Sequence, residues 1–227
     1  MVSKLVPIIF LGPSLSTEKA KKIFPFADCR APARKGDLNK LMGTDARLVG
    51  LIDGVFLQDY PPTPTEVYAL LQNKNVTLVG GASLGALRAV ELEKFGMIGI
   101  GKIFELYKKG TLYSDDEVAV TFSVQDYRLQ SEALIDMRYT LYQAYKKGII
   151  NRETKKILVT TAKSIYFPYR NYTELFERVI GTIDPEILER LKQYIKTHRR
   201  SLKEEDAIKL IEYLKHRYTE SLKETNS

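Results

Sequence analysis

The chain has 227 residues, of which 44% are hydrophobic and 28% charged, a composition that is typical of a globular protein and excludes a disordered chain. Its single cysteine, Cys29, excludes an internal disulfide framework and a cysteine-built zinc site, and indicates a reducing, cytoplasmic compartment. The net charge is +7, and residues 126–227 carry +5 of it, which suits either an acidic protein partner or a solvated lysine-rich surface.

The first half of the sequence alternates short apolar runs with helical patterns. Four apolar runs predict strands, at residues 6–11, 26–30, 48–52 and 76–79. Helical patterns lie between and after them, at residues 17–24, 64–73 and 83–93. The alternation predicts an α/β fold, with a small parallel sheet flanked by helices.

The second half of the sequence is helical. Apolar residues recur at helical spacing in three stretches, at residues 126–147, from Asp184-Pro185 through Ile195, and at 204–218. The polar tail from Glu220 is expected to fray. We therefore expect an α/β core over residues 1–125 and a helical portion over 126–227 that packs on it.

The ends of the predicted strands supply candidate binding residues. In a parallel sheet the ligand crevice lies at the carboxyl ends of the strands. One edge should therefore hold Gly12, Ser14, Asp53, Gly54, Gly81, Ala82, Leu84 and Gly85. Asp53 stands out because a carboxylate at the end of a buried strand is costly unless it is used or paired.

Residues 81–85 read G-A-S-L-G and fit the pattern G-x-S-x-G between a strand and a helix. Small neighbours permit a tight turn that exposes the Ser83 hydroxyl. The first N–H groups of the following helix can stabilise an oxyanion. The equally weighted alternative is structural, with Gly80, Gly81 and Ser83 simply turning the chain and capping the helix.

A serine nucleophile needs a base, and the first 197 residues contain no histidine. His198 and His216 are more typical of exposed positions on charged helices. The stronger candidates are three adjacent acids, Asp115, Asp116 and Glu117. Their alternative role is an acidic cap at a helix N-terminus. A dinucleotide-binding loop is disfavoured because the G-x-G-x-x-G spacing is not met.

Several ordered blocks resemble the TfuA family over about residues 8–170. They are DGVF at 53–56, GASLGALRAVEL at 81–92, FGM at 95–97, GIG at 99–101 and DDEVAV at 115–120, with RKGD at 34–37 and GPS at 12–14 fitting the N-terminal part. TfuA proteins accompany YcaO enzymes, which use ATP to modify peptide backbones and are associated with converting amides to thioamides. Their targets include ribosomally made peptide natural products and methyl-coenzyme M reductase.

The resemblance implies that the chain recruits a ThiS-like sulfur carrier, hydrolyses its terminal thiocarboxylate and delivers sulfide to YcaO. Hydrolysis of an acyl–sulfur bond is acyl transfer, which suits a serine nucleophile beside a helix N-terminus. The glycines around Ser83 are expected to leave room for the carrier's extended tail. We expect the chain itself to need no cofactor or metal, and to bind neither a membrane nor nucleic acid.

One departure from the family pattern bears on the base. A histidine often follows the DDEVAV block in the family, and Thr121 stands there in this chain. The departure favours a carboxylate base or a supporting role. Arg88 is expected to clamp the carrier tail or to pair with one of the three acids, and the alternative is an ion pair with Glu91. Two other functions stay open, a non-enzymatic scaffold that activates YcaO and a stand-alone serine hydrolase.

Overall fold

The computed structural model describes residues 6–56 and 59–225 and divides into two compact units. The first unit comprises residues 1–115 and 203–227, and the second comprises residues 116–202. This division differs from the expected boundary between residues 125 and 126, because the last helix belongs to the α/β unit.

The first unit is built on a five-stranded parallel sheet with the strand order β2-β1-β3-β4-β5. The strands are β1 (Ile8–Phe10), β2 (Asp28–Arg30), β3 (Leu48–Leu51), β4 (Thr77–Gly81) and β5 (Ile98–Ile100). In the register, Ile9 lies between Cys29 and Gly50, and Val49 lies opposite Leu78. The predicted α/β fold is confirmed. The sequence patterns identified β1 to β4, and β5 was missed.

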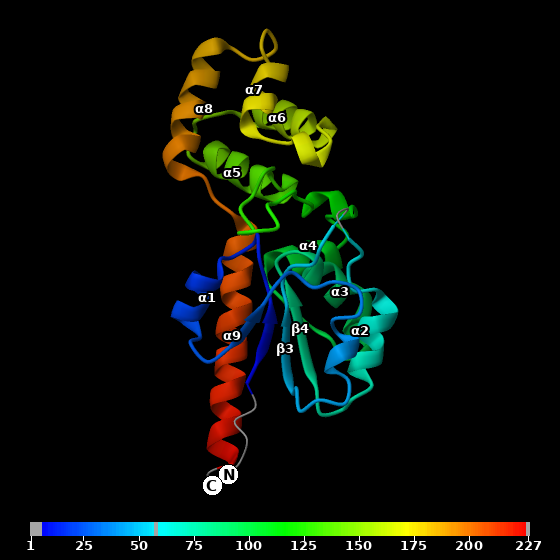
Figure 1. Cartoon of the computed structure of the whole chain (residues 1–227). Helices are drawn as coiled ribbons and strands as arrows, with labels where there is room; N and C mark the ends of the chain where they lie inside the picture. Colours follow the sequence, from blue (N-terminus) through cyan, green and yellow to red (C-terminus); the bar gives the residue numbers. More distant parts are fainter. Residues whose placement is uncertain (1–5, 57–58, 226–227) are drawn as a thin grey trace. The chain divides into compact units, whose positions relative to one another are not determined.

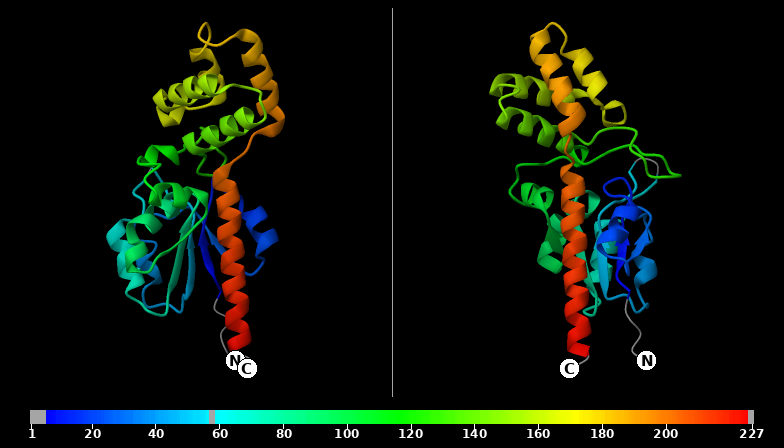
Figure 2. Two further views of the ribbon diagram at one scale, coloured as in Figure 1. Left: turned by 180° about the vertical axis from the view of Figure 1, so that it is seen from behind. Right: turned by 90° about the vertical axis from the view of Figure 1, so that its left-hand side faces the viewer.

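Helices cover both faces of this sheet, with α1 and α9 on one face and α2 and α3 on the other (Figures 1 and 2). The helices of the unit are α1 (Thr17–Ile23), α2 (Pro64–Leu71), α3 (Leu84–Leu92), α4 (Lys102–Lys108) and α9 (Leu202–Thr225). Short 3₁₀ helices are η1 (Asn39–Leu41), η2 (Glu93–Phe95) and η3 (Asp115–Glu117). Coverage of both faces explains why the central strands are continuous apolar runs.

Helix α9 closes the core on the α1 face. Its residues Leu210 and Leu214 are fully buried against strand residues that include Ile9 and Val79. The helix continues past the expected fraying point, because Tyr218 packs against Phe24 with ring centroids 5.5 Å apart, and Leu222 also packs on the core. Residues 226 and 227 lie outside the described residues.

The second unit is helical. Its elements are α5 (Leu134–Lys146), α6 (Arg152–Ser164), η4 (Phe167–Tyr169), α7 (Tyr172–Arg178) and α8 (Pro185–His198). One residue from each α-helix, Leu141, Leu158, Leu175 and Leu191, is fully buried in a shared core.

The helix predicted from residue 126 begins only at Leu134, so this prediction was wrong for its first two turns. Residues 121–131 instead form a turn, in which Phe122 bridges Leu129 in antiparallel fashion. The Ser131 hydroxyl accepts a hydrogen bond from the Thr121 N–H at 2.8 Å. Short polar side chains that bond to nearby backbone groups compete with helix formation, and they prevail here.

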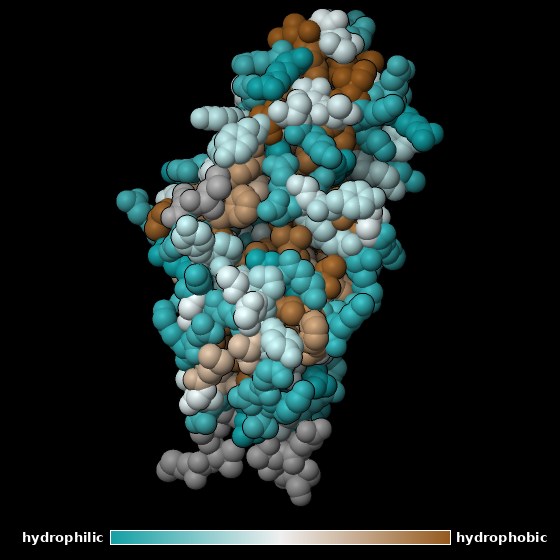
Figure 3. Space-filling view, turned by 90° about the vertical axis from the view of Figure 1, so that its right-hand side faces the viewer, coloured by the Kyte–Doolittle hydropathy of each residue, from teal (hydrophilic) through white to brown (hydrophobic). Residues whose placement is uncertain are grey.

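Hydrophilic side chains predominate on the face shown in Figure 3, with smaller groups of hydrophobic ones between them. Among the described residues, no helix is both long and apolar enough to cross a membrane.

Candidate functional site

The strand order reverses between β1 and β3. The chain leaves β1 toward β2 on one side and later returns to β3 on the other, and ligands of open α/β sheets bind where the order reverses in this way. Gly12 and Ser14 follow β1, and Asp53 and Gly54 follow β3. Because β4 is the next parallel strand, its turn at Gly81 lies at the same edge. The prediction of one common edge is confirmed.

Asp53 joins the two loops that follow β1 and β3 at this edge of the sheet. Its carboxylate is 1% exposed and accepts hydrogen bonds from the Gly12 N–H at 2.9 Å and the Ser14 N–H at 3.0 Å through Oδ2. The Ser14 hydroxyl donates to Oδ1 at 2.6 Å. Both carboxylate oxygens are therefore engaged, which satisfies the buried charge and fixes the loop after β1.

We expect Asp53→Ala to lower the free energy of unfolding by about 3 kcal/mol, because two N–H groups and one hydroxyl lose a buried acceptor. Asp53→Asn should cost only about 1 kcal/mol, since the amide oxygen can accept both N–H groups and the amide NH₂ can donate to Ser14. Urea unfolding of both variants measures the difference, with Ser14→Ala as the control that removes one bond. Equal losses for alanine and asparagine would contradict this account.

The turn between β4 and α3 is strained at Ala82. Ala82 has φ of +63°, and the Ser83 N–H donates to the Gly81 carbonyl at 2.7 Å, as in a γ-turn. A non-glycine residue in this conformation costs about 1–3 kcal/mol and is typical of functional sites. The strained residue is thus Ala82, one position before the serine of the G-x-S-x-G pattern.

Ser83 occupies the N-cap position of α3 but does not cap it. Its side chain makes no hydrogen bond to the helix N-terminus, and it has no other hydrogen-bond partner among residues 6–56 and 59–225. The residue is 8% exposed. The structural alternative, in which the Ser83 side chain caps the helix, is therefore wrong.

The backbone N–H groups that follow Ser83 differ in whether they have a hydrogen-bond acceptor. The Gly85 N–H donates to the Ile52 carbonyl at 3.2 Å, and the Ala86 N–H donates to the Ser83 carbonyl at 2.9 Å. The Leu84 N–H has no backbone acceptor in the described part of the chain. Leu84 thus carries the amide that is available to an oxyanion, and it directly follows the serine as such sites require.

The glycines of the turn serve close packing instead of leaving room for a ligand. A Cβ on Gly81 would lie 2.6 Å from the Ile100 carbonyl oxygen, and one on Gly85 would lie 1.7 Å from the Leu51 carbonyl oxygen. A Cβ on Gly54 would lie 2.1 Å from Leu84 Cδ2. The expectation that these glycines accommodate a carrier tail was wrong, because protein atoms fill the space beside them.

The three candidate acids form η3, where the sequence passes from the first unit to the second. Asp115 is exposed and belongs to the first unit, whereas Asp116 and Glu117 belong to the second. Asp116 accepts from the buried Arg170 Nη2 at 2.8 Å and 3.0 Å. Glu117 is 4% exposed, and its two oxygens accept from Arg138 at 2.8 Å each. Both carboxylates hold arginines, and a role as base stays a prediction.

Arg88 forms the ion pair that was the alternative in the sequence. Its Nη1 contacts both Glu91 oxygens, at 3.0 Å and 2.8 Å, and its Nε donates to the Pro62 carbonyl at 2.9 Å. Arg88 therefore ties α3 to the start of α2. Among the described residues, no group of three His, Cys, Asp or Glu side chains is placed to hold a metal ion.

A family model for TfuA-like proteins matches residues 53–171, slightly more than half of the chain. The chain belongs to the TfuA-like family. The match contains Asp53, Ser83, Arg88 and all three acids, and it begins after Gly12 and Ser14. Comparison with curated proteins finds no match.

Among the described residues of this TfuA-like chain, three buried acids were missed in the sequence, and two of them, Glu66 and Asp206, lie in the α/β unit. Glu66, in the first turn of α2, is 5% exposed, and its Oε1 accepts from the N–H groups of Gly36, Leu38 and Asn39. Its Oε2 has no partner in the described structure. The signal was Thr63-x-x-Glu66, a capping-box pattern, in which the glutamate here reaches a distant loop instead of the N-cap.

Asp206 of α9 is the second missed acid. It is fully buried and accepts from the Ile103 N–H at 2.7 Å, so it caps α4 from a distance of about a hundred residues in the sequence. A Cβ on Gly101 would lie 2.4 Å from the Asp206 carboxyl carbon, and Gly101 has φ of +100°. Gly101 of the GIG block therefore makes room for the Asp206 carboxylate at the start of α4. No local sequence signal reveals this cap, because Asp206 lies in α9.

Proposed function

We propose that the chain supplies sulfide to a YcaO partner by hydrolysing the thiocarboxylate at the end of a ThiS-like sulfur carrier. The observation that carries the proposal is the turn after β4. There, a serine hydroxyl without a hydrogen-bond partner among the described residues precedes an amide that is equally unengaged. Membership of the TfuA-like family supports the pathway, and ATP would be used by YcaO.

The chemistry is an acyl transfer in two steps. Ser83 Oγ attacks the thiocarboxyl carbon, its proton passes through a base to the thiocarboxylate sulfur, the C–S bond breaks, and hydrosulfide leaves. An ester between Ser83 and the carrier remains, and water cleaves it to a carboxylate and the free serine. The Leu84 N–H would stabilise the oxyanion that forms in each step. The thiocarboxylate sulfur is deprotonated at neutral pH and must gain a proton to leave as hydrosulfide, so the group that accepts the serine proton also donates it to the sulfur.

Sulfur transfer through a cysteine is the less favoured route. Cys29 in β2 is half-buried, and burial raises the pKa of its thiol, which reduces the thiolate needed to carry a persulfide. A scaffold that only activates YcaO would leave the unengaged Ser83 hydroxyl and the strain at Ala82 without a role.

Incubation of the chain with a thiocarboxylated ThiS-like carrier should release one sulfide per carrier without ATP and without YcaO. Methylene-blue detection of sulfide, together with the mass change of the carrier from thiocarboxylate to carboxylate, measures the reaction. Cys29→Ala should release sulfide at the wild-type rate. Release that requires Cys29 would overturn the hydrolytic route, and an absence of release would favour the scaffold.

A further inference from the structure

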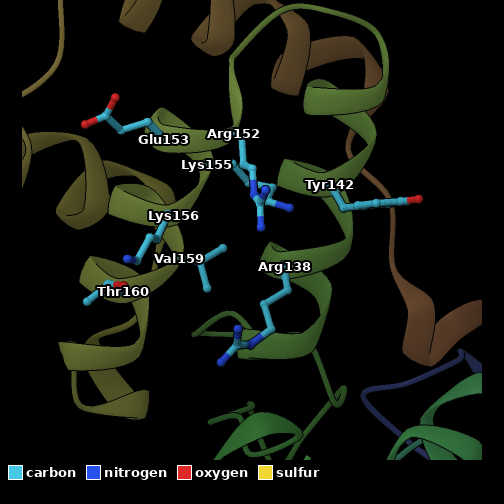
Figure 4. A pocket seen from close by; sticks show the side chains of 8 residues that line it. All are labelled: Arg138, Tyr142, Arg152, Glu153, Lys155, Lys156, Val159 and Thr160. Carbon is cyan, nitrogen blue, oxygen red and sulfur yellow. The ribbon is translucent and has the colours of Figure 1, made fainter. Parts of the chain in front are cut away.

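The second unit contains a groove between α5 and α6 that the proposed hydrolysis does not use. Its volume is about 720 Å³, within the range of about 300–1,000 Å³ found for ligand sites. It is lined by Arg138, Tyr142, Arg152, Glu153, Lys155, Lys156, Val159 and Thr160 (Figure 4). All eight residues belong to α5 or α6, so the groove lies within one unit.

The groove carries an excess of positive charge. Four of its lining side chains are cationic and one is acidic, and Figure 4 shows the Glu153 carboxylate turned away from the cations. Arg152 and Lys156 are exposed and form no ion pair with the described residues. Two cationic side chains thus face solvent at the groove without an acidic partner in the described part of the chain.

The other two cations are held in place by their neighbours. Arg138 is fixed by the bidentate contact of its Nε and Nη2 with Glu117, which leaves its Nη1 for other acceptors. The Lys155 ammonium lies 4.7 Å from the ring centroid of Tyr145 and 5.7 Å from that of Tyr142. These contacts position both cations without neutralising Lys155.

The arrangement of the cations on α6 is costly for the helix. Arg152 begins the helix and Lys155 ends its first turn, where the helix dipole disfavours cations. Arg152 is also separated from Lys155 and Lys156 by three and four residues, so like charges lie on one face and repel one another. Such local conflicts in an otherwise consistent fold are expected where a surface binds a partner.

The donors in this groove fit an extended anion better than a compact one. The N–H of Thr154 is taken by Asn151 Oδ1 at 2.8 Å, and that of Lys155 by the Asn151 carbonyl at 3.1 Å. The fork of Arg138 is mostly occupied by Glu117. The groove instead offers long cationic side chains spread over two helices, which match carboxylates spaced along a peptide.

We propose that the α5–α6 groove binds an acidic, extended segment of a partner protein. The proposal stands on the groove alone and does not depend on thiocarboxylate hydrolysis. Each exposed ion pair contributes only about 0.2–1 kcal/mol, so affinity rests on several pairs together and falls as salt rises. The exposed ring of Tyr142 and the side chain of Val159 add apolar surface between the cations.

The test measures binding of a fluorescently labelled octaglutamate peptide by anisotropy. The double variant Arg152→Glu/Lys156→Glu should bind at least about tenfold more weakly than wild type, since two attractive contacts become repulsive. The matched control is Arg190→Glu/Lys196→Glu, which changes two exposed cations of α8 in the same unit and alters the net charge equally. The control should stay within about twofold of wild type.

A second double variant separates a loss of binding from misfolding. Arg152→Gln/Lys156→Gln removes both charges without repulsion and should still weaken binding several-fold, with an unchanged thermal melting curve. Equal weakening in the α8 control would overturn the proposal, because it would show a general charge effect. Tighter binding of inorganic phosphate, or of an oligonucleotide of equal charge, than of octaglutamate would also overturn it.

Discussion

Ser83→Ala is expected to reduce sulfide release from a thiocarboxylated carrier on the order of a thousandfold or more, because it removes the attacking oxygen. The fold should be retained, since the Ser83 hydroxyl makes no hydrogen bond to the described residues and α3 does not use it as a cap. The carrier should still bind. Sulfide release per carrier, with melting temperature and carrier affinity measured in parallel, separates loss of chemistry from loss of structure.

The control for this variant is chemical rescue of the whole pathway. Excess free sulfide should restore thioamidation by YcaO with Ser83→Ala, because the missing step lies upstream of YcaO. Unchanged release from Ser83→Ala would remove the nucleophile assignment, and the turn would then be an anion-binding helix start. Thioamidation that stays intact with Ser83→Ala, both with free sulfide and with carrier-borne sulfur, would favour the scaffold.

The base is tested by single amide substitutions of the acids. Asp115 is exposed, so Asp115→Asn should leave stability unchanged and reveal a catalytic role directly. Asp116→Asn and Glu117→Gln should lower the free energy of unfolding, since each weakens a contact with an arginine. The partner of Asp116 is the buried Arg170, and the partner of Glu117 is the half-buried Arg138. A rate loss for these two counts toward catalysis only where the melting temperature is retained.

The fold was predictable where local patterns were strong. Continuous apolar runs at 48–52 and 76–79 identified two central strands, and Pro64 identified the start of α2. Strand β5 was missed because it has three residues with a glycine in the middle. Helix α4 was missed because its cap, Asp206, comes from α9. Helix α6 carried a signal, Asn151 before a helical pattern, that was overlooked.

The candidate site was predictable in its placement and less so in its contacts. Parallel connections forced the ends of β1, β3 and β4 to one edge, so Asp53 and Ser83 lie there as expected. The hydrogen-bond partners of Asp53 could not be predicted, because they lie in a loop about 39 residues away in the sequence. Likewise, only the packed structure shows that Gly81 and Gly85 face backbone carbonyls instead of an open channel.

Gly85→Ala is expected to lower the free energy of unfolding by about 4 kcal/mol or more, the largest change in stability that we expect. Its Cβ would lie 1.7 Å from the Leu51 carbonyl oxygen and 2.6 Å from the carbonyl carbon. The atoms that it meets are backbone at the end of a central strand, so neither side can move cheaply. Helix α3 would have to leave β3, and the bond from the Gly85 N–H to the Ile52 carbonyl would be lost.

Gly96→Ala is the matched control for Gly85→Ala. Gly96 has φ of +102° but no atom within 4 Å of a Cβ position, so alanine there bears only backbone strain, about 1–2 kcal/mol. Urea unfolding measures the loss of stability of both variants. Gly85→Ala reports the steric clash with β3, and Gly96→Ala reports the backbone strain alone. A Gly85→Ala protein as stable as Gly96→Ala would contradict the seating of α3 on β3. With that seating lost, the position of Ser83 at the edge of the sheet would lose its support as well.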